Sequence, residues 1–100
     1  MADLALIKQF PSDFLFGVAT SSYQIEGNSF GGCGLSHWDD FAKLPGNVLD
    51  RENGRIACSH INNYQQDIGL VADAGFSSYR FSFSWPRILP KGKGQINGQA

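Results

Sequence analysis

Charged residues, cysteines and long apolar runs are all scarce in this sequence, and each scarcity excludes a class of protein. Charged residues make up 17% of its 100 residues and sum to a net charge of −1, so nucleic acid and anionic membranes are not expected as partners. The basic residues near the end, Arg87, Lys91 and Lys93, are expected to lie in a solvated loop. No apolar run approaches the roughly 18 residues of a membrane-spanning helix, so no membrane partner is expected.

Only two cysteines are present, Cys33 and Cys58, and two thiols cannot build a disulfide framework. The N-terminus carries an acid at Asp3 and has no long apolar core before a small-residue cleavage site. It is therefore a poor secretory signal. Together these two observations predict a cytoplasmic protein.

Cysteine and histidine occur as two close pairs, and their spacing argues against a metal site. Cys33 lies shortly before His37 in a run of glycines, and Cys58 is separated from His60 by one residue. The second pair is too close for the chelating spacings of structural zinc sites, and the first lies in a flexible segment. We therefore expect neither a metal nor a cofactor.

Aromatic residues are plentiful, at 13% of the chain, and their most regular arrangement lies at residues 77–90. Aromatic side chains there alternate with polar ones: Tyr79, Phe81, Phe83 and Trp85 with Arg80, Ser82 and Ser84. Because side chains alternate faces along a strand, this pattern predicts a strand over about 78–84. Its polar face either meets water or lines the inside of a barrel. Pro86 should end the ladder, since proline has no N–H to donate.

Two earlier segments have patterns typical of a strand and of a helix. A nearly continuous apolar run at about 14–19 predicts a strand buried on both faces of a parallel sheet, and small hydroxyl residues follow it. Residues 58–74 carry apolar side chains at helical spacing and are followed by Gly75, a natural residue just past a helix end. Strand, helix and strand in this order make a βαβ unit with parallel strands.

Residues 28–56 form a long irregular region between the first strand and the helix. A brief helical turn is expected to begin at Ser36, with Ser36 as its N-cap. Asp39 and Asp40 would lie in its first turn, where their negative charges interact favourably with the helix dipole, and they are not expected to form a catalytic pair. Parallel strands need cover on both faces, which two strands and one helix cannot supply. The chain is at most one small domain by length, and it is predicted to be the start of a larger α/β architecture.

Several blocks of the sequence resemble glycoside hydrolase family 1, in the order in which that family has them. They are residues 14–27 (FLFGVATSSYQIEG), 36–39 (SHWD) with Phe41, 57–58 with His60, and 79–90 (YRFSFSWPRILP). The resemblance runs from about Phe10 to Asn97, and its first and last blocks are highly specific. It implies a (β/α)8 TIM barrel of which about 14–19 and 78–84 are the first two strands. It also implies a retaining β-glycosidase, similar to β-glucosidases, that hydrolyses terminal β-linked sugars of a small β-glycoside or oligosaccharide.

The resemblance further implies which residues belong to the site. Gln24 matches the glutamine that hydrogen-bonds sugar hydroxyls, and Arg80 matches the arginine beside the nucleophile. Glu26 matches a motif glutamate outside the catalytic pair, while Trp38 and Asp39 look structural. The two catalytic glutamates belong to later blocks that these 100 residues lack. The chain alone is therefore expected to be inactive and to need the remainder of the barrel, in the same or a complementing chain. The alternative is a non-catalytic fragment that acts as a binding or assembly module.

Two departures from the family pattern occur in the predicted helix. Its start usually reads Ala-Cys-Asp-His, and Ser59 stands in place of the acid; Asn63, Gln65 and Gln66 stand where charged residues are common. These changes weaken the electrostatics of the first helical turn without touching the sugar site. The identity of the sugar and of the aglycone is left open, because later loops decide both.

Overall fold

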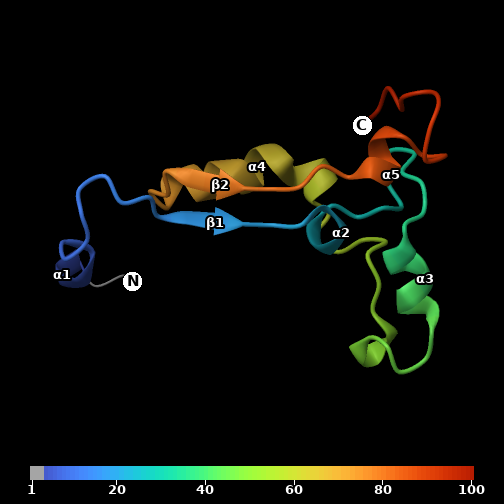
Figure 1. Ribbon diagram of the computed structural model, residues 1–100, viewed down its shortest axis with the longest axis horizontal. Helices are drawn as coiled ribbons and strands as arrows, with labels where there is room; N and C mark the ends of the chain where they lie inside the picture. The colour runs from blue at the N-terminus through green and yellow to red at the C-terminus, as the bar shows by residue number, and fades with distance from the viewer. Residues whose placement is uncertain (1–3) are drawn as a thin grey trace.

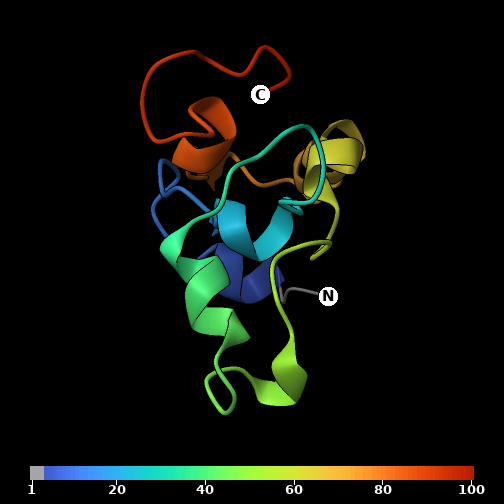
Figure 2. The same ribbon diagram turned by 90° about the vertical axis from the view of Figure 1, so that its right-hand side faces the viewer.

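The computed structural model describes residues 4–100 as a βαβ unit with further short helices along its connections (Figure 1). The elements, in order, are α1 (Leu4–Ile7), β1 (Gly17–Ala19), α2 (Ser22–Ile25), α3 (His37–Lys43), a 3-10 turn (Leu49–Arg51), α4 (His60–Asp73), β2 (Ser78–Arg80) and α5 (Trp85–Ile88). In Figure 1, α1 lies at one end of the long axis and α3 and α5 at the other. In the end-on view of Figure 2, α2 lies between α5 and α3.

The two strands pair in parallel, as the sequence predicts. Their register joins Gly17 to Ser78, Val18 to Tyr79 and Ala19 to Arg80. Backbone bonds extend this pairing by one residue at each end: the Ser77 amide donates to the Phe16 carbonyl at 3.1 Å, and the Thr20 amide donates to the Arg80 carbonyl at 3.0 Å. The segments that follow the two strands therefore leave the sheet at the same end.

Both strands are shorter than the sequence predicts. β1 begins at Gly17 instead of about residue 14, and β2 ends at Arg80 instead of about residue 84. A two-stranded ladder can be no longer than the stretch over which both strands find a partner. Before β1, the rings of Phe14 and Phe16 pack against Phe10, with centroids 4.7 and 5.2 Å from it.

The chain after β2 turns into a short helix, so Pro86 does not end the ladder as expected. The ladder has already ended, and Pro86 lies in the first turn of α5, where a missing N–H is tolerated. Ser84 is the N-cap of this helix, and its hydroxyl accepts a bond from the Arg87 amide at 3.3 Å.

The long helix α4 agrees closely with the predicted span of 58–74. It begins at His60 because Ala57 and Ser59 both have positive φ angles, which interrupts the helix before that point. At its other end Gly75 has φ +85° and its amide donates to the Ala72 carbonyl at 3.0 Å, the geometry of a glycine that follows a helix end.

The expected turn at Ser36 is also present, as helix α3. Ser36 is its N-cap and forms a capping box with Asp39, and Asp39 and Asp40 both lie in the first turn. The helices α1, α2 and α5 have only four residues each and were not predicted, because such short segments show no helical periodicity.

The described part of the chain has almost no core. Ala42 is its one buried apolar residue, and no side chain within residues 4–100 is fully buried. Gly17 and Ala19 of β1 are exposed, so the predicted burial on both faces is not reached within this chain. The Cα radius of gyration is 17.1 Å. A compact domain of this length has about 13 Å. The sheet thus lacks the second cover that parallel strands require.

Candidate functional site

The segments that follow β1 and β2 begin at the same end of the sheet. Polar contacts join these two segments directly. The Thr20 hydroxyl and the Tyr79 phenol share a hydrogen bond of 2.7 Å. Arg80 Nη1 donates to the Thr20 carbonyl at 3.0 Å. One step further on, the Ser22 amide donates to the Ser82 hydroxyl at 2.9 Å. The polar face predicted for residues 80–84 therefore meets the segment after β1.

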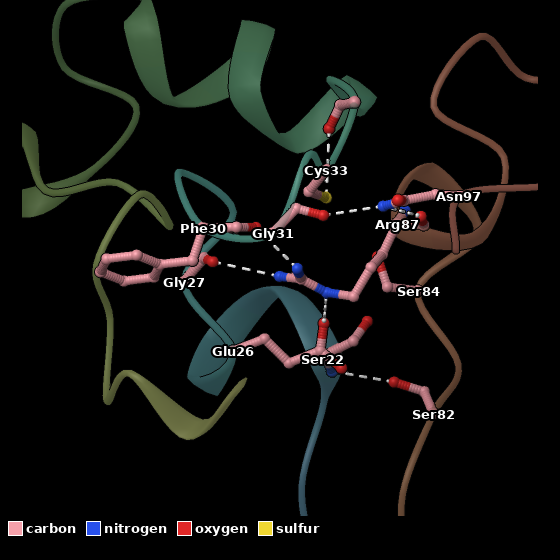
Figure 3. A network of polar contacts seen from close by, with 11 residues as sticks. Ser22, Glu26, Gly27, Phe30, Gly31, Cys33, Ser82, Ser84, Arg87 and Asn97 are labelled. Atoms are coloured by element: carbon pink, nitrogen blue, oxygen red, sulfur yellow. Dashed lines mark hydrogen bonds and ion pairs between the residues drawn. The ribbon is translucent and has the colours of Figure 1, made fainter. Parts of the chain in front are cut away.

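A buried guanidinium, that of Arg87, lies at the centre of the polar network drawn in Figure 3. Arg87 Nε donates to the Glu26 carboxylate at 3.1 Å, with 4% of the Arg87 side chain and 18% of the Glu26 side chain exposed. Its other nitrogens donate to two backbone carbonyls, Nη1 to Phe30 at 2.7 Å and Nη2 to Gly27 at 3.1 Å. Arg87 was expected in a solvated loop, and that expectation is wrong. The three acceptors compensate the buried charge.

The C-terminal tail is attached to the same network through an amide side chain. Asn97 Nδ2 donates to the Gly31 carbonyl at 2.7 Å and to the Arg87 carbonyl at 3.0 Å. Nearby, the Gly34 amide donates to the Pro86 carbonyl at 2.8 Å. Glycine is required at position 34, because a Cβ there would lie 2.1 Å from the Pro90 carbonyl oxygen. The segment after β1 and the segment after β2 are therefore held in contact along much of their length.

A second polar cluster surrounds Asp39, whose structural role was inferred from the family resemblance. The carboxylate accepts bonds from the Ser36 amide at 2.7 Å and from the Asn28 side-chain amide. Asp39 is buried, while its neighbour Asp40 is exposed and pairs with Lys43 at 3.6 Å. The two acids thus serve helix capping and a surface ion pair.

The two residues assigned to the sugar site lie on different parts of this edge. Gln24 lies on α2, is exposed, and borders a surface cavity shared with Trp38 and Phe41. Arg80 is the last residue of β2, is exposed, and donates a hydrogen bond to the Thr20 carbonyl. None of the three main cavities among residues 4–100 is lined by both side chains. Gln24 and Arg80 therefore do not share any of these three cavities.

A separate cleft of about 440 Å³ opens between the two loop segments. Hydroxyls of Ser22, Ser36, Ser82 and Ser84, the carboxylates of Glu26 and Asp39, and the rings of Trp38 and Trp85 line it. Sequence reasoning identified neither the cleft nor the roles of Arg87, Asn97 and Asn28. The only signal that bears on Arg87 is its place in the specific block at 79–90.

One titratable group beside this cleft has a shifted pKa. Burial raises the pKa of the Cys33 thiol above its ordinary value, and the nearby Arg87 guanidinium opposes this with a smaller lowering effect. The thiol donates weakly to the Gly34 carbonyl at 3.3 Å. Both cysteines are free, Cys33 half-buried and Cys58 exposed.

The metal ligands weighed from the sequence do not gather in the described residues. His60 instead pairs with Asp67 along α4, its Nδ1 2.7 Å from the carboxylate. Within residues 4–100 no group of three or more histidine, cysteine or acidic side chains could hold an ion. None of the helices described here is long and apolar enough to cross a bilayer.

Known proteins that resemble this chain share both its sequence and its geometry. β-Glucosidase A of Thermotoga maritima is 50% identical over 92 residues, which are 91% of this chain and 21% of that protein. The β-glucosidase of an Agrobacterium species is 52% identical over 93 residues, which are 92% of this chain and 20% of that protein. A solved structure of the family 1 β-glucosidase from Thermotoga maritima matches with a TM-score of 0.79 at 50% identity, covering 88% of this chain and 20% of that one.

The chain thus spans about a fifth of the length of the curated relatives it matches. A family model described as glycosyl hydrolase family 1 matches residues 6–100. Because that match takes in nearly the whole sequence, the chain belongs to glycosyl hydrolase family 1.

Proposed function

We propose that this chain is the N-terminal βαβ portion of a (β/α)8 barrel that hydrolyses terminal β-linked sugars with retention of configuration. The observation that carries the proposal is the parallel pairing of β1 with β2, in a chain that belongs to this family. Catalytic residues of such barrels lie where the strands end, which is the edge at which Gln24, Arg80 and the polar network lie here. We also propose a cytoplasmic location for the complete barrel, which the scarcity of cysteines supports.

Retaining hydrolysis needs two carboxyl groups about 5–5.5 Å apart, one as nucleophile and one as acid and base. The carboxylates beside the cleft already have structural partners: Glu26 holds Arg87, and Asp39 caps α3. We therefore assign both catalytic glutamates to the remainder of the barrel. The chain alone is then inactive, and the remainder, in the same or a complementing chain, is its partner.

Within that enzyme, Gln24 contacts the sugar and Arg80 supports the nucleophile. The Gln24 amide offers a donor and an acceptor, so it can engage two neighbouring hydroxyls of a glycoside. A guanidinium beside the nucleophile lowers the pKa of that carboxylate and keeps it ionised for attack. No metal or cofactor takes part in this proposal, because the two carboxylates perform both steps.

The test compares this chain alone with the assembled enzyme, by which we mean the chain together with the remaining four fifths of the barrel. We expect the assembled enzyme to hydrolyse a chromogenic β-glucoside and to release the β-anomer first, as followed by NMR. The chain alone should show no turnover.

Release of the α-anomer would reject the retaining mechanism. Turnover by the chain alone that is lost on changing Glu26 or Asp39 would reject the assignment of the glutamates to the remainder. An inert assembled enzyme that still binds sugar would favour the alternative of a binding or assembly module.

A further inference from the structure

The short helix α2 carries Gln24 and cannot hold its own position. It has four residues, and Ser21 at its N-cap makes no side-chain bond to the helix. Isolated helices shorter than about 12–15 residues are marginal in water, because nucleation is unfavourable. The orientation of Gln24 is therefore fixed by whatever contacts hold α2 from outside.

The Tyr23 phenol of this helix accepts a bond from the Gly54 amide at 3.0 Å. Two further contacts hold the two ends of the helix, and both come from the segment after β2. At the first residue, the Ser22 amide donates to the Ser82 hydroxyl at 2.9 Å. At the C-cap, the Glu26 carboxylate accepts from Arg87 Nε at 3.1 Å. The Glu26 amide also donates to the Ser22 carbonyl at 2.9 Å, so the acid is joined directly to the helical turn. Gln24 lies between these two attachments.

Arg87 is the stronger of the two anchors. Its guanidinium makes three bonds: one to Glu26 and one each to the Gly27 and Phe30 carbonyls of the following loop (Figure 3). Bonds to an ionised group are stronger than neutral ones, and the planar fork fixes their directions. Ser82 contributes a single neutral bond, so its loss should matter less.

The backbone of Arg87 is itself held firmly. Its amide bonds to Ser84, the N-cap of α5, and its carbonyl accepts from Asn97. On the other side, the Glu26 carbonyl accepts from the Ile61 amide at 3.2 Å, at the start of α4. The ion pair thus connects α2 to α5 and lies beside the first turn of α4.

We infer that Arg87, acting through Glu26, is a positioning residue for Gln24. The inference rests on the proposed function, because it takes Gln24 as the sugar contact. Arg87 touches no substrate; it fixes the end of α2 so that the Gln24 amide meets the sugar hydroxyls. A role confined to stability would alter the amount of folded enzyme and leave the sugar contact of each folded molecule unchanged.

The test is a double-mutant cycle in the assembled enzyme, with rates referred to the concentration of titrated active sites. Arg87→Met should lower kcat/KM by about 10- to 100-fold, the effect of misplacing a contact by about 1 Å. In a Gln24→Ala background the same change should have less than about a 3-fold effect, because the contact it positions is already gone. Arg51→Met, an exposed arginine in the 3-10 turn, is the matched control and should leave kcat/KM unchanged.

Glu26→Gln provides the second variant, in case Arg87→Met folds poorly. It keeps the shape of the acid and an acceptor for Nε, so we expect a smaller loss of kcat/KM that also vanishes in the Gln24→Ala background. Equal effects in the two backgrounds, for either change, would overturn the inference.

A second readout does not depend on catalysis. Amide hydrogen exchange of the Gln24 and Glu26 amides, followed in the same assembled protein, should accelerate in Arg87→Met and stay unchanged in Arg51→Met. Unchanged exchange in Arg87→Met would overturn the inference. If the unmodified assembled enzyme hydrolyses no β-glycoside, the proposed function fails, whereas the exchange rates still decide whether Arg87 holds α2.

Discussion

Two charged side chains, Arg87 and Asp39, are buried in a chain that otherwise buries very little. As whole residues they are 3% and 6% exposed, and each is surrounded by backbone and side-chain partners from loops. Removing one partner of a buried charge typically destabilises a protein by about 3–5 kcal/mol, because the other charge is left uncompensated. These two residues therefore stabilise the arrangement of the loops, in a chain that has almost no apolar core to do so.

Gln24 is the residue whose change should affect sugar binding most directly. In the assembled enzyme we expect Gln24→Ala to lower kcat/KM, by about 1–3 kcal/mol for each sugar hydroxyl left without its partner. The loss should be much smaller for deoxy-glycosides that lack the contacted hydroxyls. Steady-state kinetics on both substrates provide the measurement.

Gln65→Ala serves as the control for that prediction, since Gln65 is an exposed glutamine on α4. It should leave kcat/KM for both substrates unchanged. If Gln24→Ala reduces hydrolysis of the normal and the deoxy sugar equally, Gln24 only holds its loop and does not bind the sugar.

Cys33 should require unusually alkaline conditions for alkylation. Burial raises the pKa of its thiol, and only the thiolate reacts. The rate of iodoacetamide labelling, measured in the assembled enzyme with Cys58→Ser, should therefore reach half its maximum above the ordinary thiol pKa of about 8.5. A midpoint at or below that value would contradict the burial of Cys33.

The same shift affects stability in a defined direction. A thiol that binds its proton more tightly in the folded state stabilises that state below its unfolded pKa of about 8.5. This contribution is lost as the pH rises through the raised pKa of folded Cys33.

At the residue scale the sequence predicted local roles better than long-range ones. The Ser36 cap and the role of Asp39 follow from spacings of a few residues, and the structure contains both. Arg87 was assigned to solvent because its acceptor Glu26 is 61 positions away, and no local pattern indicates such a partner. The roles of Gln24 and Arg80 stay predictions.

At the scale of single elements, α4 offers a direct test of one departure from the family. Its first turn contains no acid, and Ser59 makes no side-chain cap. In a synthetic peptide of residues 57–76, Ser59→Asp should raise helicity by the equivalent of about 0.3–1 kcal/mol, through the helix dipole. Far-ultraviolet circular dichroism is sensitive here, because a helix of 14 residues is marginal alone.

The matched control is Ser59→Asn, which tolerates the same left-handed backbone without adding charge. The gain from the acid should also shrink in concentrated salt, since the dipole interaction is screened. Equal helicity of the two variants would show that the missing charge has no effect on α4.

The elements themselves were predicted unevenly, for a physical reason. The helix at 60–73 has enough turns to show its periodicity, and the parallel order of the strands follows from the connection between them. The strand ends depend on where a partner strand is available, which the local alternation of residues 78–84 does not encode. The helices α2 and α5 are fixed by tertiary bonds and leave no periodic pattern.

The molecule as a whole exposes far more surface than a compact domain of the same mass. Its accessible area is 7884 Å² for 10.9 kDa. A compact monomer of that mass has roughly 5,600 Å². Large apolar side chains form much of the excess, among them Leu15, Phe83 and Trp85 at 69%, 80% and 63% exposure. Such a surface normally marks an interface.

We therefore expect the purified chain alone to aggregate or to show no cooperative thermal transition. Both edges of the β1–β2 pair are unpaired within the described chain, and unpaired edges promote association between chains. Calorimetry and light scattering at several protein concentrations provide the test. The matched comparison is the same chain with the remainder of the barrel supplied in trans, which should give a soluble complex with a sharp transition. A monomer that melts cooperatively alone would instead support an independent binding module.

The register of the sheet also sets a delay during synthesis. Ser78 follows its partner Gly17 by 78 − 17 = 61 positions. At about 5–20 residues per second, a ribosome needs roughly 3–12 s to make that stretch. Throughout this interval the apolar residues 14–19 exist without a strand to pair with, although hydrophobic collapse takes less than a millisecond. We therefore expect chaperones that bind nascent chains to have several seconds in which to reach the first strand before its partner is made.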